Sequence, residues 1–309
     1  MLSLTSGRKV AIIDDNRKEF VFLKNDDEGE PEIETTPDNK LNIFKKYLQM
    51  DKKLSVMDIS TLIKSYEKGD DSIEGKLNRK YDNAIQYVKN SLKKHLDYGT
   101  KHKLFPIIDE DSYRLFVSGL SGSGKSYFIS EFLKYNKPKV QGAGIFLFSP
   151  VKEDKAFKNI KNLIHLDLEE LFETMKGKDL EIEDIPDGSV VVFDDLESFP
   201  KNIRKKYMDL RDTFLERGRG HSEGQKGIST ITVSHNARNG NATKASIRES
   251  QYWVLFPTAN KVDVKNLFKL YGGLDTKDID LLMNQKSRWC FFKKSIPQYA
   301  IGEHSIVVI

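Results

Sequence analysis

Cysteine, arginine and long apolar runs are all scarce in this sequence of 309 residues. The one cysteine, Cys290, has no partner for an internal disulfide, and its aromatic neighbours predict a buried strand position rather than a reactive thiol. No apolar run approaches the roughly 18 residues of a membrane span, and the first residues lack the apolar core of a signal peptide. We therefore expect no membrane span, and a location in the cytosol or a compartment continuous with it.

The composition is that of a globular protein with a mildly basic balance of charge. Hydrophobic residues make up 38% of the chain and aromatic residues 10%, enough to bury the core of one large or two ordinary domains. The net charge of +4 permits a nucleic-acid partner without demanding one. Only 11 residues are arginines, yet four of them lie within sixteen positions: Arg204, Arg211, Arg217 and Arg219. Because a guanidinium is a planar fork that matches phosphate oxygens, this cluster favours a role at phosphate groups.

A complete phosphate-binding loop follows the apolar run 113–117. Glycines at both ends let the backbone turn tightly, so that successive N–H groups cradle the β- and γ-phosphates of a nucleoside triphosphate at the start of the next helix. Lys125 is placed to reach the terminal phosphates, and the Ser126 hydroxyl to bind Mg²⁺. Residues 127–135 have apolar side chains at helical spacing, as the motif requires. The chain is predicted to bind ATP and Mg²⁺ through Gly119, Leu120, Ser121, Gly122, Ser123, Gly124, Lys125 and Ser126.

Polar residues also end two later apolar runs. Asp194 and Asp195 directly follow the run 189–193, so they are expected beside the phosphate loop. Asp194 is predicted to hold Mg²⁺ through water, and Asp195 to orient or deprotonate the attacking water. The strand expected at 228–233 leads into Ser234 and His235, either of which can sense the γ-phosphate, although a simple strand-end cap is an equal alternative.

Apolar runs alternate with helical stretches, which predicts a parallel sheet with helices on both faces. One full strand, 144–148, lies between the loop strand and the carboxylate strand, an arrangement that kinases and small GTPases usually lack. We therefore predict a P-loop NTPase of the additional-strand, RecA-like type over residues 109–309, with C-terminal helices and a hairpin. Its strands are expected at 113–118, 144–148, 189–193, 228–233 and 252–256.

Residues 1–108 are predicted to form a separate, mostly helical N-terminal region. It begins with a short strand pair, 10–13 and 20–23, around a turn at 14–17. The acidic segment 25–39 resists packing, so we expect disorder or an exposed insertion there. Three basic helices follow within 40–103, a stretch with a net charge of +7, for which a solvated face is the simpler interpretation.

A basic helix beginning at Lys201 leads into a glycine-loosened loop that contains Arg217, Arg219 and His221. Such a loop can enter the active site of a neighbouring subunit. An arginine supplied there neutralises charge that develops on the γ-phosphate, worth roughly 10³ to 10⁵ in rate. Arginines on a solvated loop are the alternative, and spacing alone does not rank Arg217 against Arg219.

Over roughly residues 110–309, the chain resembles the genome-packaging ATPases of large double-stranded DNA viruses, including the poxvirus type, within the FtsK/HerA superfamily. The resemblance rests on the phosphate loop, Asp194 and Asp195, the arginine-then-histidine loop, the strand end 233–235, and the C-terminal stretches 253–257, 270–274, 287–289 and 296–299.

The resemblance implies a homo-oligomeric ring that couples ATP hydrolysis to translocation of double-stranded DNA into a preformed capsid. A capsid vertex or portal protein would be a partner, and the location would be the host-cell cytoplasm, the viral factory or the virion. Asp194 would be the Mg²⁺-associated acid, and Arg217 or Arg219 the finger that acts in trans. Family members often have glutamate where this chain has Asp195, and often glutamine where it has Ser234 and His235. An aspartate reaches less far toward the water, so Glu197 is an alternative base.

Two other functions fit parts of the sequence. Asn260, Lys261 and Asp263 copy the pattern that selects guanine in GTPases, which would make the chain a GTPase or nucleotide kinase. A GTPase should also have glycine where this chain has Glu197, so we predict instead that 260–263 caps a helix at 261–270. The other alternative is a nucleotide-switched protein that docks on DNA or a capsid through the helices of 40–103. Further candidate DNA contacts are Lys201, Arg204, Lys205 and Lys206.

Overall fold

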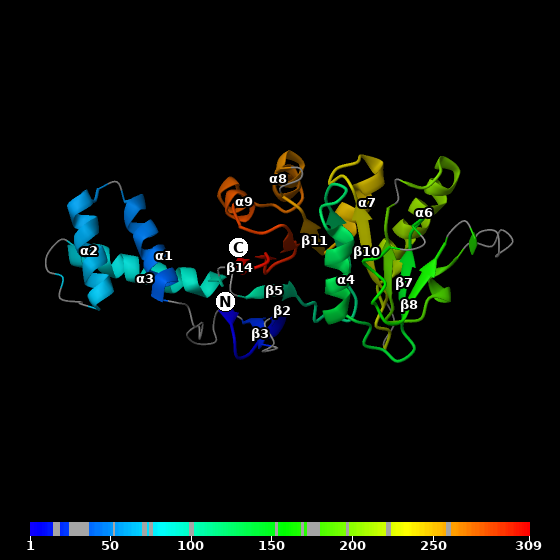
Figure 1. The fold of residues 1–309 in the computed structure, drawn as a ribbon, viewed down its shortest axis with the longest axis horizontal. Coiled ribbons are helices and arrows are strands. Elements are labelled where there is room, and N and C mark those ends of the chain that lie inside the picture. Colours follow the sequence, from blue (N-terminus) through cyan, green and yellow to red (C-terminus); the bar gives the residue numbers. More distant parts are fainter. Residues whose placement is uncertain are drawn as a thin grey trace. The chain divides into compact units, whose positions relative to one another are not determined.

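The computed structural model divides the chain into two compact units, Met1–Lys103 with His304–Val308, and Leu104–Glu303 with Ile309 (Figure 1). It describes residues 1–14, 19–24, 37–51, 53–69, 73, 77–98, 102–151, 154–167, 170–171, 180–195, 198–220, 224–257 and 261–309. Within these ranges, no helix has both the length and the apolar composition needed to cross a membrane.

The smaller unit begins with an antiparallel sheet. Strand β3 (Glu19–Leu23) pairs with β1 (Leu2–Ser3) on one side and with β2 (Arg8–Asp14) on the other. The predicted strand pair is confirmed, whereas residues 15–17 of its predicted turn lie outside the described residues. The same holds for residues 25–36 of the predicted acidic segment. Its last three residues, 37–39, were wrongly assigned to that segment, because they form the first turn of a helix.

Three helices form a second core in this unit: α1 (Pro37–Met50), α2 (Val56–Lys68) and α3 (Asn78–Lys94). Phe44 of α1, Leu62 of α2 and Tyr81 of α3 are buried against one another, as the spacing of apolar residues predicts. Helix α2 starts at a capping box between Ser55 and Asp58 and ends at Gly69, whose φ of 63° is left-handed. After α3, strand β4 (His95–Asp97) pairs with β14 (Ser305–Val308), the last strand of the chain.

The larger unit is built on one mixed sheet whose order is β13-β12-β11-β6-β10-β9-β7-β8. The strands from β11 to β8 run parallel, and β12 joins antiparallel beside β11. Figure 1 shows the order from β11 through β10 to β7. The bounds of its strands are β6 (Arg114–Ser118), β7 (Ile145–Phe148), β8 (Leu163–Leu166), β9 (Val190–Phe193), β10 (Ser229–Ser234), β11 (Tyr252–Leu255), β12 (Cys290–Lys293) and β13 (Tyr299–Ile301). A further strand, β5 (Lys103–Pro106), precedes β6 along the chain.

This order confirms the additional-strand type of P-loop NTPase, but a different strand supplies it. Strand β10 lies between the loop strand β6 and the carboxylate strand β9, and it pairs in parallel with both. The strand placed there by the sequence, β7, lies on the far side of β9. The chain order was misleading because a parallel strand is inserted by a long crossover, so neighbours along the chain need not be neighbours in the sheet.

Helices cover both faces of the sheet, as predicted. Tyr113, just before β6, packs edge-on against Phe132 of α4 (Lys125–Tyr135). The next residue, Arg114, instead donates from Nε to the carbonyl of Leu215 in α6 (Lys201–Arg217), 2.9 Å away. Because successive strand residues point to opposite faces, α4 and α6 lie on opposite faces of the sheet. The other helical elements are η2 (Ile182–Asp184), α7 (Asn241–Glu249), α8 (Lys261–Leu270) and α9 (Thr276–Met283).

Two smaller predictions are tested by these elements. Cys290 is buried in β12, and burial raises the pKa of its thiol to about 12, as expected for a structural rather than a reactive cysteine. Helix α8 spans the predicted residues 261–270, while Asn260, its predicted cap, lies outside the described residues.

Candidate nucleotide-binding site

The phosphate loop joins β6 to α4 and is shaped by its glycines. Gly122 and Gly124 have left-handed φ values of 74° and 99°, which side chains rarely tolerate. A Cβ on Gly119 would lie 2.9 Å from the side chain of Phe256. Phe256 directly follows β11, the other strand paired with β6, so it supports the loop from behind. Sequence reasoning did not single out Phe256, because only the sheet order brings it to the loop.

The loop has the features of a phosphate cradle. Its residues 120–122 and 124 are exposed, and α4 starts at Gly124, which offers no side-chain cap. The amide groups and positive dipole end of that helix therefore face an approachable space. The Ser123 hydroxyl is buried and, among the described residues, has no hydrogen-bond partner. The residues present fit a chain of phosphates.

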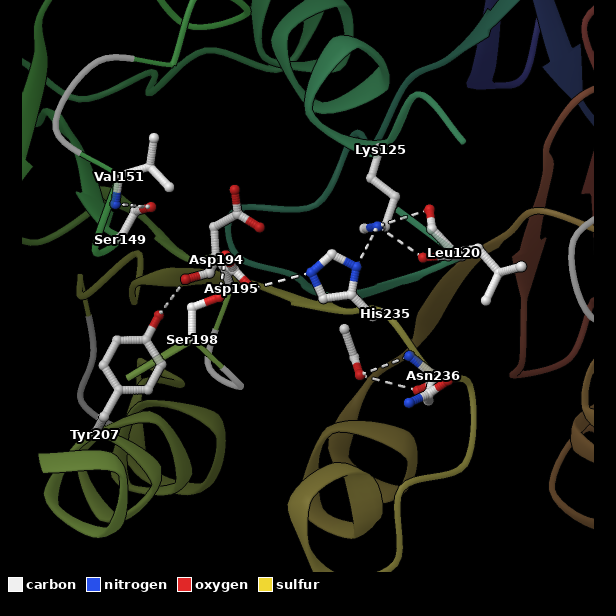
Figure 2. Close-up of polar contacts among 12 residues, drawn as sticks. Leu120, Lys125, Ser149, Val151, Asp194, Asp195, Ser198, Tyr207, His235 and Asn236 are labelled. Atoms are coloured by element: carbon white, nitrogen blue, oxygen red, sulfur yellow. Dashed lines mark hydrogen bonds and ion pairs between the residues drawn. The ribbon is translucent and has the colours of Figure 1, made fainter. Parts of the chain in front are cut away.

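Lys125 is folded back into the loop and is 7% exposed (Figure 2). Its ammonium donates to the carbonyls of Gly119, at 2.7 Å, and Leu120, at 3.1 Å. It also lies 3.2 Å from Nδ1 of His235, the residue just after β10. The lysine and the predicted sensing histidine therefore meet at the loop.

His235 connects Lys125 to the carboxylate strand. Its Nε2 lies 3.0 Å from Oδ1 of Asp195, and the Ser198 hydroxyl donates to Oδ2 of Asp195 at 2.5 Å. Asp195 has a φ of 55°, a left-handed conformation that is costly for a non-glycine residue and concentrates at functional sites. The other sensor candidate, Ser234, donates its hydroxyl to the carbonyl of Asn236 and forms a local turn.

Asp194 lies beside this chain of contacts. Its N–H donates to the carbonyl of Phe148 in β7, and its own carbonyl accepts from the Tyr207 hydroxyl. Burial, and next the charge of Asp195, raise the pKa of Asp194 to about 6 from a usual 3.8. The folded chain thus holds this proton to higher pH than the unfolded chain. The stability that this group contributes is present below about pH 4 and is lost as the pH rises through about 6.

A cation near Asp194 would relieve the cost of its charge, and the positive charge of Lys125 already does so in part. Ser126, half-buried in the first turn of α4, and Asp194 are oxygen donors of the kind that Mg²⁺ prefers. In the parts of the chain that are described, no group of three or more metal-binding side chains occurs. Mg²⁺ characteristically keeps several waters and binds phosphate oxygens beside one or two protein oxygens, which suits a site of this kind.

The predicted arginines lie elsewhere on the unit. The loop with Arg217 and Arg219 follows α6 and leads into the start of β10, whereas the phosphate loop, Asp194 and His235 follow strand ends. In a parallel sheet, these are opposite edges. The structure thus brings together Lys125, Asp194, Asp195 and His235, but not the two arginines. His221 and Glu197, the alternative base, lie outside the described residues.

At that opposite edge, Arg217 and Arg219 border a cavity of about 600 Å³. Arg217 lies 3.6 Å from Glu183, and Arg219 lies 3.3 Å from Glu249. Both arginine side chains are at least half exposed. Such exposed pairs contribute little stability and are readily exchanged for another anion.

The remaining arginines of the cluster have structural contacts. Arg204 donates to the carbonyl of Phe199, and the buried Arg211 donates to Asp212 and the carbonyl of Ala242. Arg114, which sequence reasoning did not consider, is buried in β6. Burial, and next the charge of Arg219, lower the pKa of Arg114 to about 10. No local pattern distinguished it, because its partners lie in α6 and the loop that follows.

No protein-family model matches the chain. A curated relative, uncharacterized protein V3 of Sputnik virophage, is 26% identical over 193 residues, 62% of this chain and 74% of that protein. Solved structures similar to the chain include the genome packaging NTPase B204 of Sulfolobus turreted icosahedral virus 2 in complex with sulfate. It is 11% identical with a TM-score of 0.38, over 64% of this chain and 96% of that one.

A second solved structure is the pCW3 conjugation coupling protein TcpA with ATPγS, which is 15% identical with a TM-score of 0.40, over 68% of this chain and 66% of that one. At these identities, the likeness concerns the fold alone. The P-loop fold expected from the sequence motifs is confirmed by the order of the sheet itself. The GTPase alternative is not favoured, because β10 separates the loop strand from the carboxylate strand.

Proposed function

We propose that this chain is an ATP-hydrolysing motor that translocates double-stranded DNA into a viral capsid. The observation that carries the proposal is the contact chain from Lys125 through His235 to Asp195, beside Asp194, at the strand ends of an additional-strand sheet. It supplies a phosphate cradle, a cation for the terminal phosphates and groups that can act on water. These are the parts that hydrolysis of a nucleoside triphosphate requires.

Ser126 and Asp194 would hold Mg²⁺ in this proposal, Asp194 through water. When bound, such an ion would neutralise charge on the phosphates of the nucleotide. Lys125 leaves the carbonyls of Gly119 and Leu120 and binds the terminal phosphates instead. The backbone amides at the start of α4 orient the phosphate chain.

The location of the arginines supports an assembly of several subunits. Arg217 and Arg219 lie at the opposite edge of the sheet from the phosphate loop, so they cannot act on a nucleotide bound to the same chain. A head-to-tail contact between subunits would bring one subunit's arginine loop to the next subunit's phosphate loop. Head-to-tail contacts that close form rings. We therefore propose a homo-oligomeric ring with an arginine that acts in trans.

Support for DNA as the partner comes from the motif resemblance and from exposed cations. Lys201 and Lys205 are exposed and lie four residues apart, on one face of α6. Arg204 is a weaker candidate, because its guanidinium already donates to the carbonyl of Phe199. We propose a capsid vertex or portal protein as the partner at which the motor delivers DNA.

Duplex DNA is expected to stimulate ATP hydrolysis by the full chain. Steady-state hydrolysis is measured with and without linear duplex DNA at several salt concentrations, with GTP in place of ATP as a second substrate. We expect the stimulation to require ATP and to weaken steeply with salt, because phosphate contacts release counterions. A rate indifferent to DNA at low salt would contradict the motor. A more than tenfold preference for GTP, about 1.4 kcal/mol, would favour the GTPase alternative.

A further inference from the structure

We propose that His235 takes the proton from the attacking water, and that Asp195 is a positioning residue that holds His235. This proposal rests on the proposed hydrolysis of ATP, and it changes the assignment of the base. It does not depend on DNA, on the ring or on the arginine loop.

The contacts of His235 fix which ring nitrogen carries the proton. A lysine ammonium has only hydrogen atoms to donate, so Nδ1 of His235, 3.2 Å from it, must be the acceptor. An ionised carboxylate can only accept, so Nε2, 3.0 Å from Asp195, must carry the hydrogen. These contacts therefore place the hydrogen on Nε2 and a lone pair on Nδ1.

That lone pair is directed toward the phosphate loop. In Figure 2, the ring of His235 lies between Lys125 and Asp195, with Nδ1 on the side of the loop. The Lys125 ammonium, which contacts Nδ1, also donates to two loop carbonyls. It therefore lies at a position from which bound phosphates would attract it. When Lys125 moves to the phosphates, Nδ1 is free to accept from a water molecule beside them.

Asp195 is less suited to be the base. Both of its carboxylate oxygens already accept, Oδ1 from His235 and Oδ2 from Ser198. Its short side chain is fixed by a left-handed backbone at the end of β9. In a hydrolase triad, an acidic residue likewise holds a histidine in the correct tautomer and stabilises its charged form.

In the proposed step, water attacks the γ-phosphate of ATP. The water oxygen forms a bond to the γ-phosphorus while the bond from that phosphorus to the β–γ bridging oxygen breaks, and its electron pair leaves with ADP. The water proton moves to Nδ1, and the resulting imidazolium is stabilised by Asp195. Hydrogen phosphate departs, and His235 returns the proton to solvent. No oxidant, reductant or second substrate is needed.

The first test is chemical rescue of basal ATP hydrolysis by the full chain, without DNA. We expect His235→Ala to lower the rate of hydrolysis by about 10²- to 10⁴-fold. Added imidazole should raise the rate of this variant, and of no other, by at least about tenfold. Asp195→Asn should also lose activity, without rescue. The double variant should be no slower than His235→Ala, because the two residues act as a unit. Binding of a fluorescent ATP analogue should change little.

His165→Ala is the matched control. His165 lies in β8, where its Nε2 is 3.0 Å from the carbonyl of Ser149. It should keep the wild-type rate and respond to imidazole as wild type does. The proposal would be overturned if Asp195→Asn were inactive while His235→Ala kept nearly the wild-type rate. It would also be overturned if the rate of the double variant fell by the product of the two single effects. The first outcome would make Asp195 the base, and the second would mean that the two residues act independently.

The second test does not use activity. Nitrogen NMR of the isotope-labelled full chain, with His235→Ala to assign the signal, should show His235 protonated on Nε2. A non-hydrolysable ATP analogue with Mg²⁺ should shift Nδ1, and Lys125→Ala should shift it without nucleotide. A proton on Nδ1 in the free protein would overturn the proposal even if hydrolysis is DNA-stimulated. If imidazole rescues basal hydrolysis by the His235→Ala variant but DNA does not stimulate hydrolysis by the wild type, only the proposed motor function would be contradicted.

Discussion

Lys125→Ala is expected to lower ATP hydrolysis by at least about 10²- to 10³-fold, the cost of removing one preorganised group that stabilises transition-state charge. Lys125 belongs to the phosphate loop, and its ammonium lies within hydrogen-bond distance of two loop carbonyls and His235. Nucleotide binding should weaken as well, because the ammonium also pairs with ground-state phosphates. Steady-state hydrolysis and titration with a fluorescent ATP analogue measure the two effects separately.

Lys134→Ala is the control for that substitution. Lys134 lies in the last turn of the same helix, forms an ion pair with Glu131 and is exposed. Because the pair lies on the surface, its removal should change stability little and hydrolysis not at all. A Lys125→Ala protein that folds and still hydrolyses ATP at nearly the wild-type rate would mean that the loop is not the site of hydrolysis.

Arg219→Ala is expected to lower DNA-stimulated hydrolysis by roughly 10³- to 10⁵-fold, the range observed for arginine fingers. Arg219 lies between Gly218 and Gly220 in the loop, whereas Arg217 is the last residue of α6. The loop position allows Arg219 to reach farther toward a neighbour, and its contact with Glu249 is exposed and exchangeable. Arg217→Ala should therefore have the smaller effect.

Mixing two inactive variants distinguishes action in trans from loss of folding. An Arg219→Ala subunit keeps an intact phosphate loop, and a Lys125→Ala subunit keeps an intact arginine. Where the second supplies its arginine to the first, one complete site forms, so the mixture should regain activity that neither variant has alone. Arg248→Ala, an exposed arginine on α7, is the matched control and should be active alone. A mixture without recovered activity would contradict the trans arrangement.

The parts of the site that local sequence determines were predictable. A strand, a glycine-rich turn and a helix form consecutively, so Gly119–Ser126 could be placed from spacing alone. The same holds for Asp194 and Asp195 at the end of β9, and for the predicted strands at β6, β7, β9, β10 and β11. Strand β8 was not predicted, because its four residues are mostly half-exposed and lack a continuous buried pattern.

The parts that depend on sheet order were not predictable. The insertion of β10 between β6 and β9 places His235 between Lys125 and Asp195, residues that are 110 and 40 positions away along the chain. The sequence offers Ser234 or His235 as the sensor, with a simple strand-end cap as an equal alternative. In the structure, Ser234 donates to the carbonyl of Asn236, whereas His235 contacts Lys125 and Asp195. Arg114 and Phe256 were overlooked for the same reason, since each depends on a partner from a distant element.

The shortened acidic side chain at position 195 has a physical explanation in this arrangement. In the family that the chain resembles, a glutamate often stands there and reaches farther. Here the histidine ring fills the intervening distance, with one nitrogen toward Asp195 and the other toward the loop. The two departures from the family pattern, aspartate and histidine, are therefore compatible with each other.

The most direct test of the central claim, that hydrolysis moves this chain along DNA, is displacement of a third strand. A labelled oligonucleotide is bound as a triplex near one end of a linear duplex, and its release by the full chain is followed over time. We predict release that requires ATP, is lost with a non-hydrolysable analogue and with Lys125→Ala, and is delayed in proportion to the length of duplex before the triplex. Vigorous ATP hydrolysis without release, or release that is independent of ATP, would contradict the motor.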